Sequence, residues 1–257
     1  MLFRSSDIVI DVSDGGTGAN PVHIVGSTLG VGTILNRNNT NGTTAVIDCQ
    51  ASGVQFNGLR LTGGARGFLQ DTGTSSNSLV NCFIYANKSG VQLASTGSLS
   101  VVNTTLADNF LTGIDATAAT NVPTILNTIL WNNGDDLVAC QATYSDVQDG
   151  DAGTGNFSAN PQFVNSATRD YHILGASRCI DAGTNATSLL PSVDIDGQPR
   201  IFAGLVDIGA DERSWSVRLT ASTNTIPERT GATATLTVSR DGSLFKNLTA
   251  FIDKIGR

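Results

Sequence analysis

Aspartates at related positions of a repeat are the residues of this sequence best suited to chemistry. Asp108 and Asp115 follow one repeat, and Asp135 follows the next. Paired carboxylates on neighbouring turns can serve as acid and base on a glycosidic bond. Carboxylate oxygens also bind Ca²⁺, and a calcium ion would acidify the proton beside a uronate carboxyl group, as a lyase requires. The alternative interpretation is that these aspartates are solvated turn residues.

Two aromatic residues share one position of the repeat. Tyr85 and Trp131 each stand four residues after a recurring asparagine, with Ala107 at that position in between. Two turns of stacked strands are about 10 Å apart, which suits a sugar chain lying across the stack. Aromatic faces are good platforms for sugar rings. Packing of both rings against loops is the alternative.

Basic residues are rare in the repeat and could complete such a site. They are Arg60, Arg66 and Lys88. We expect Arg60 to bind substrate and Lys88 to act as a lyase base if it lies beside the carboxylates.

These residues are positioned by a repeat of 22 to 24 residues. Four segments align on asparagines at positions 57, 81, 103 and 127, and a second asparagine recurs six positions later in three of them, at 87, 109 and 133. A period in the low twenties without a dense leucine pattern favours a parallel β-helix. A buried column of asparagines is stable there because each amide can bond to the next. We therefore predict an all-β fold, a right-handed parallel β-helix with an inner asparagine ladder.

The composition supports this fold and excludes several functions. Only 14% of the 257 residues are charged and 28 are glycine, which is typical of an all-β repeat protein. The net charge of −7 and the absence of a basic cluster argue against nucleic acid as a partner. No apolar run is long enough for a membrane span, and the N-terminal residues do not resemble a signal peptide.

Cysteines and histidines give weaker signals. None of the four cysteines forms a CxxC motif, so a zinc site built on them is not predicted. Cys140 and Cys179 could form a disulfide in an oxidising compartment, but the sequence does not fix their distance. His23 and His172 stand in no nucleophile motif. We interpret His172 as an ordinary strand or surface residue.

The period ends after Cys140, and a different set of motifs follows. They are NPQFV (160–164), DYHILGASRCIDAG (170–183), DIDGQPR (194–200) and VDIGADE (206–212). With NTILWNNG (127–134) and YSDVQ (144–148), this order resembles the choice-of-anchor Q domain, a right-handed β-helix of bacterial surface and secreted proteins. Asp211 departs from the resembled pattern, which often has Tyr there. The resemblance implies a pectate-lyase-like fold and an extracellular or cell-surface location, but it does not imply one activity.

The DIDG motif at Asp194 and Asp196 is a weak metal signal. It is similar to part of a calcium loop, but the full EF-hand pattern is missing. A structural Ca²⁺ is one interpretation. Since the resembled family carries this motif as part of its fold, turn geometry with Arg200 as a partner is the other.

The pattern of apolar and polar residues changes again near Ser214. Alternating apolar and polar residues at Val217–Leu219 and Ala234–Val238 resemble the opening strands of a Calx-β-like sandwich, which needs about 100 residues. We therefore predict a β-helix at 1–213 and a partial β-sandwich-like tail at 214–257, and we expect a piece of a longer, multi-module protein that is a monomer.

The leading functional hypothesis is an extracellular module that binds a polysaccharide and cleaves it by lyase or hydrolase chemistry. A non-catalytic adhesive or spacer module of a bacterial surface protein is the first alternative. A hydrolase of small esters with an unrecognised site is the second.

Overall fold

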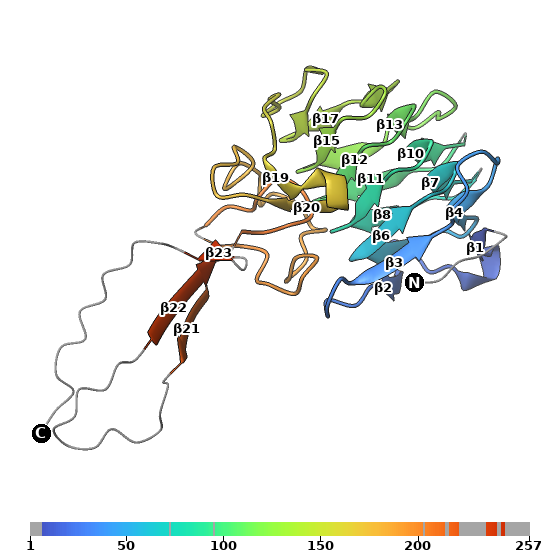
Figure 1. The fold of residues 1–257 in the computed structure, drawn as a ribbon. Helices are drawn as coiled ribbons and strands as arrows, with labels where there is room; N and C mark the ends of the chain where they lie inside the picture. The colour runs from blue at the N-terminus through green and yellow to red at the C-terminus, as the bar shows by residue number, and fades with distance from the viewer. Residues whose placement is uncertain are drawn as a thin grey trace, which may run out of the picture. The chain divides into compact units, whose positions relative to one another are not determined.

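The computed structural model describes residues 7–71, 73–94, 96–202 and 204–213, and the backbone of three strands at 216–220, 235–240 and 243–244. The chain divides into two compact units, Met1–Glu212 and Arg213–Arg257. The first unit consists of short strands stacked in successive coils, as Figure 1 shows from β1 to β17. Because every neighbouring pair of strands in these coils is parallel, the predicted parallel β-helix is confirmed.

Three parallel sheets of six strands form the walls of the solenoid. The first sheet contains β1 (Ile8–Ile10), β4 (Ala45–Cys49), β7 (Arg66–Gln70), β10 (Ser89–Leu93), β13 (Thr112–Asp115) and β16 (Leu137–Val138). The second contains β2 (Val22–Val25), β5 (Val54–Asn57), β8 (Asn77–Val80), β11 (Leu99–Val102), β14 (Thr124–Leu126) and β17 (Ala142–Thr143). The third contains β3 (Thr33–Asn36), β6 (Leu59–Thr62), β9 (Phe83–Tyr85), β12 (Thr105–Ala107), β15 (Ile129–Trp131) and β18 (Asp146–Val147).

Apolar side chains of equivalent strands stack into columns inside the walls. In the second sheet, Phe56, Leu79, Val101, Ile125 and Ala142 are aligned by the strand register and are almost completely buried. The other two sheets contribute similar columns. Each coil thus buries the inward-facing apolar side chains of the next coil. This explains why short, imperfectly alternating strands suffice to build a core.

Asparagine occupies the corner between the second and third sheets because the backbone there is left-handed. Asn81, Asn103 and Asn127 have φ between 46° and 50°, and Gly58 takes the same position in the preceding coil with φ 69°. Asparagine and glycine tolerate this conformation better than other residues. Asn57 pairs with Val80, so its predicted alignment with Asn81 was wrong by one residue.

The predicted inner ladder is not formed by these corner asparagines. Their side-chain amides donate to carbonyls of the later part of the chain, from Asn81 to Val193 at 2.7 Å, Asn103 to Asp207 at 3.3 Å and Asn127 to Thr184 at 2.9 Å. The column therefore faces a covering segment rather than the solenoid interior. Only Asn81 also contacts the asparagine of the preceding coil, at 3.3 Å from Asn57 Oδ1.

A true ladder is formed by the second asparagine of the repeat. Asn87 Nδ2 donates to Asn109 Oδ1 at 3.1 Å, and Asn109 Nδ2 donates to Asn133 Oδ1 at 2.9 Å. Asn133 Nδ2 ends the series on Asp136 Oδ1 at 2.8 Å. Asn87 and Asn109 are buried, so the ladder satisfies polar groups that would otherwise destabilise the core.

The remaining part of the first unit, after β18, is largely irregular. It contains an antiparallel hairpin of β19 (Phe163–Asn165), the 3₁₀ turn η2 (Ser166–Thr168) and β20 (Asp170–Ile173). Another 3₁₀ turn of the first unit, η1 (Val12–Asp14), lies near the N-terminus, after β1. Residues 179–212 supply the carbonyls that the corner asparagines bind.

The second unit contains three antiparallel strands, β21 (Ser216–Thr220), β22 (Thr235–Arg240) and β23 (Ser243–Leu244). These strands include the two runs predicted from alternation, apart from Ala234, which lies outside the described residues. The Calx-β-like identity of this unit stays a prediction.

Candidate functional site

Asp108 lies at the centre of a polar cluster on the solenoid surface. It follows β12 at a left-handed corner, with φ 55°, and is half-buried. Its Oδ2 accepts hydrogen bonds from Arg169 Nη1 at 2.6 Å and from the Tyr171 hydroxyl at 2.7 Å. Its Oδ1 accepts from Asn132 Nδ2 at 2.6 Å. Both oxygens are therefore engaged, which favours a positioning role over proton transfer.

The β19–β20 hairpin brings Arg169 and Tyr171 to this aspartate. Arg169 caps η2 in the left-handed conformation, with φ 66°, and this bend places it beside the start of β20. Tyr171 is 1% exposed and packs against Phe83, Tyr85 and Phe163. Burial, and then the hydrogen bond to Asp108, raise the pKa of its hydroxyl, which therefore stays a hydrogen-bond donor.

Three adjoining hollows share Asp108 in their walls. One of about 360 Å³ includes Asn41, Lys88 and Phe110. The next, of about 540 Å³, includes Phe110, Asn132 and Arg169. The third, of about 470 Å³, includes Trp131, Asn132 and Gln162. Because each hollow shares a second residue with the next, they form one groove that crosses several coils. We call this the Asp108 groove.

Phe110 is the most exposed aromatic side chain of this groove. It is 78% exposed and lies in the wall shared by the first two hollows. It extends from the turn after β12, where Asn87 and Lys88 carbonyls hold the backbone of Phe110 and Leu111. Phe110 was not among the predicted site residues, although a large apolar residue in a polar turn was a usable signal.

The two residues predicted as aromatic platforms, Tyr85 and Trp131, differ in their exposure. The register pairs Tyr85 with Ala107 and Ala107 with Trp131, so they do share a column. Tyr85 is only 6% exposed because Tyr171 covers it, with ring centroids 5.1 Å apart. Trp131 is half-buried and lines the Asp108 groove. The predicted continuous platform is therefore interrupted by the hairpin.

The predicted basic residues also separate. Lys88 is exposed and lies in the Asp108 groove with Asp108 itself. Arg60 is buried, lies over the Phe83 ring at 4.6 Å and pairs with Asp196 at 3.5 Å. It lines a separate hollow of about 340 Å³ together with Tyr85 and His172.

Asp115 and Asp135 line none of these four hollows. Asp115, at the end of β13, accepts hydrogen bonds from Gln92 Nε2 at 3.3 Å and from the Thr117 amide at 2.9 Å. Asp135 is exposed in the turn before β16. The structure thus brings Lys88 and Trp131 to Asp108 but gives it no second carboxylate from the predicted set.

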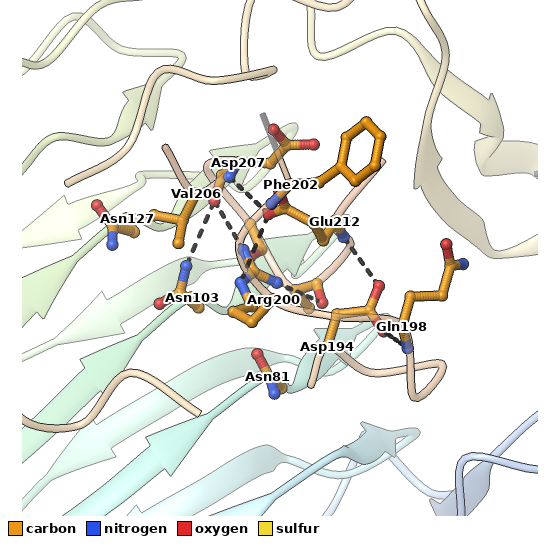
Figure 2. A network of polar contacts seen from close by, with 12 residues as sticks. Asn81, Asn103, Asn127, Asp194, Gln198, Arg200, Phe202, Val206, Asp207 and Glu212 are labelled. Carbon is orange, nitrogen blue, oxygen red and sulfur yellow. Dashed lines mark hydrogen bonds and ion pairs between the residues drawn. The ribbon is translucent and has the colours of Figure 1, made fainter. Parts of the chain in front are cut away.

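Asp194 belongs to a structural network rather than to an open site. Its oxygens accept from the backbone amides of Asp196, Gln198 and Glu212 at 2.8 to 3.0 Å. Figure 2 shows this network around Arg200, whose guanidinium donates to the carbonyls of Asp207, Gly209 and Ala210. Arg200, which was predicted as the partner of this motif, forms an ion pair with Glu212, with 3.8 Å between Nε and Oε2. Glu212 also accepts hydrogen bonds from the backbone amides of Phe202 and Asp207.

His172 was predicted to be an ordinary strand or surface residue, but it contacts two carboxylates. Its Nε2 lies 2.7 Å from Asp196 Oδ2, and its Nδ1 contacts Asp170 Oδ1. Burial alone would lower the pKa of His172, but the close contact with the Asp196 carboxylate and the charge of Asp211 raise it to about 9. The lone histidine of this region therefore sits among three carboxylates.

The four cysteines are all free thiols, so the open possibility of a Cys140–Cys179 disulfide is not realised. Cys179 instead contacts Asp146 Oδ2 at 3.3 Å. Burial raises the pKa of the Cys49 thiol to about 11 and that of Cys82 to about 12, which makes both unreactive packing residues.

Among the described residues, no helix has the length and apolarity needed to cross a bilayer. Comparisons with protein-family models, with curated proteins and with solved structures find no match to this chain.

Proposed function

We propose that this chain binds a polysaccharide along the Asp108 groove. The observation that carries the proposal is the continuity of three hollows across successive coils, with Phe110 exposed between two of them. An exposed ring can stack on a sugar face. Asparagine and glutamine side chains around it can donate to and accept from sugar hydroxyls.

Binding is favoured over cleavage by the state of Asp108. Its oxygens accept three hydrogen bonds, one of them from the paired Arg169. A general base or nucleophile needs a lone pair available to its substrate. Asp108 is better suited to fixing Asn132, Arg169 and the hairpin in the shape that the ligand meets.

The motifs of the later chain support an extracellular setting for this activity. We propose that the protein is a surface or secreted module of the kind that the choice-of-anchor Q resemblance implies. The residues of that resemblance that surround Arg200 form one buried network, which is consistent with a role in folding rather than in substrate contact.

The test is affinity electrophoresis and calorimetry on a panel of neutral and acidic polysaccharides, with product analysis by chromatography. We expect retardation by at least one polysaccharide and about a fivefold to tenfold loss of affinity in Phe110→Ala and Trp131→Ala, since a stacked ring contributes about 1–1.5 kcal/mol. The matched control is Leu111→Ala, because Leu111 is exposed beside Phe110 but lines none of the four hollows.

Equal affinity of Phe110→Ala and Leu111→Ala would overturn the groove as the binding site. No binding by the wild type would leave the spacer interpretation. Release of oligosaccharides that is lost in Asp108→Asn would show that the groove also cleaves.

A further inference from the structure

We propose that His172, Asp196 and Asp211 form a binding site for a transition-metal dication, with Zn²⁺ as the fitting ion. One ligand atom from each residue lies within 4.8 Å of the other two. The three come from separate parts of the chain, namely β20, the DIDG turn and the segment before Glu212. This site is distinct from the Asp108 groove and does not depend on polysaccharide binding.

The geometry of His172 points to a common third partner for two ligands. Its Nε2 atom is buried and makes no hydrogen bond of acceptable geometry, although Asp196 Oδ2 lies only 2.7 Å away. Two ligands of a Zn²⁺ ion, each about 2.0–2.1 Å from it, lie about 3 Å apart and need not point at each other. The close but misaligned contact is what such a pair leaves.

Asp170 completes the arrangement from behind the ring. Its Oδ1 contacts His172 Nδ1, so that Nε2 is the nitrogen directed at Asp196 and Asp211. A metal-bound histidine commonly donates its other ring N–H to a carboxylate, which fixes the tautomer and the ring orientation. Asp170 is thus a positioning residue, while Asp211, 3% exposed, anchors the buried side of the site.

The local charge favours a cation. Asp170, Asp196 and Asp211 place three carboxylates around the His172 imidazole, and Arg60 lies 3.5 Å from Asp196 Oδ1. A bound metal ion would replace the proton that the imidazole otherwise shares with these carboxylates. Since Arg60 contacts Oδ1 and His172 faces Oδ2, Asp196 can serve both partners at once.

The donor set selects the class of metal. Imidazole with two carboxylates suits Zn²⁺ and related ions, whereas Ca²⁺ takes six to eight oxygen ligands. Three protein ligands leave a coordination position open. A hollow of about 340 Å³, lined by Arg60, Asp170 and His172, reaches the histidine ligand from one side. Asp194, whose oxygens accept three backbone amides, is not a ligand.

The experiment is calorimetric titration of chelator-treated protein with ZnCl₂ and with CaCl₂, and metal analysis after gel filtration. We expect one equivalent of Zn²⁺, at least tenfold weaker Ca²⁺ binding, and at least tenfold weaker Zn²⁺ binding in His172→Gln and Asp211→Asn. Asp170→Asn keeps the three ligands and is expected to lose about tenfold. His23→Gln is the matched control, because His23 is exposed on β2 and is not one of the three clustered ligand residues, so this variant should leave binding unchanged.

Circular dichroism of each variant shows whether it has folded. X-ray absorption of the Zn²⁺-loaded wild type provides a second readout, with one imidazole among light-atom ligands expected. The proposal is overturned if the wild type binds no Zn²⁺, if folded His172→Gln and Asp211→Asn bind as His23→Gln does, or if the spectrum lacks an imidazole.

Discussion

The two asparagine columns of the repeat use the same residue for opposite purposes. At the corner between the second and third sheets, asparagine provides a left-handed backbone and directs its amide outward to residues 184–207. Six residues later, asparagine directs its amide along the solenoid to the equivalent residue of the next coil. The outer column attaches the later chain to the coils, whereas the inner column attaches the coils to one another.

The largest expected effect comes from the segment that the outer column holds. Arg200→Met removes three hydrogen bonds to carbonyls and leaves Glu212 buried without its cation. We expect the free energy of unfolding to fall by about 3–5 kcal/mol, as measured by urea denaturation. Arg178→Met is the control, because Arg178 is exposed and stacks on Phe157. A loss below 1 kcal/mol for Arg200→Met would contradict this role.

A direct comparison of the columns should give a smaller difference. Asn109→Ala removes the buried hydrogen bonds that Asn109 makes with Asn87, Asn133 and the Ile84 carbonyl. It should lower the unfolding free energy by about 2–3 kcal/mol. Asn103→Gly keeps a residue that tolerates φ 46° and loses one hydrogen bond, so about 1 kcal/mol is expected. Thermal and urea unfolding measure both. Equal losses would mean that the columns are not different in kind.

A further effect is a pH dependence of stability at the end of the inner ladder. Burial raises the pKa of Asp136 from 3.8 to about 6, against the hydrogen bond from Asn133. The native state therefore binds the proton more tightly than the unfolded state, and this group makes stability fall as pH rises from about 4 to about 6. About 3 kcal/mol is expected from the difference between these two pKa values.

Asp136→Asn should remove this contribution, while Asp135→Asn, its exposed neighbour, should not. The measurement is the wild-type-minus-variant stability difference at each pH, which cancels the other titrating groups. A difference that is flat between pH 4 and 6 would show that Asp136 is not responsible.

The architecture could be predicted from the sequence because the repeat acts locally. Coil length, short strands and recurring asparagines are all properties of neighbouring residues, and they gave the parallel β-helix. The alignment was wrong only where Asn57 stands beside Gly58, since both residue types tolerate the left-handed corner. Which asparagine column faces inward depends on strand phase at the corner, which a pattern of turns does not reveal.

The candidate site was less predictable because distant parts of the chain build it. Tyr85 looked like an open platform until Tyr171, from a hairpin that follows the coils, covered it. His172 gained its meaning from Asp196 and Asp211, which follow it at irregular spacings and match no metal-binding motif. Such long-range contacts leave no periodic signal in one sequence.

The attachment of the later chain to three successive coils has a mechanical consequence. Val193, Thr184 and Asp207 each accept from a corner asparagine of a different coil, so one segment spans several rungs. A stack held only by contacts between neighbours can fray one rung at a time from its end. Here the later segment ties several coils together. A chain under tension must therefore break these hydrogen bonds before the middle coils can unfold.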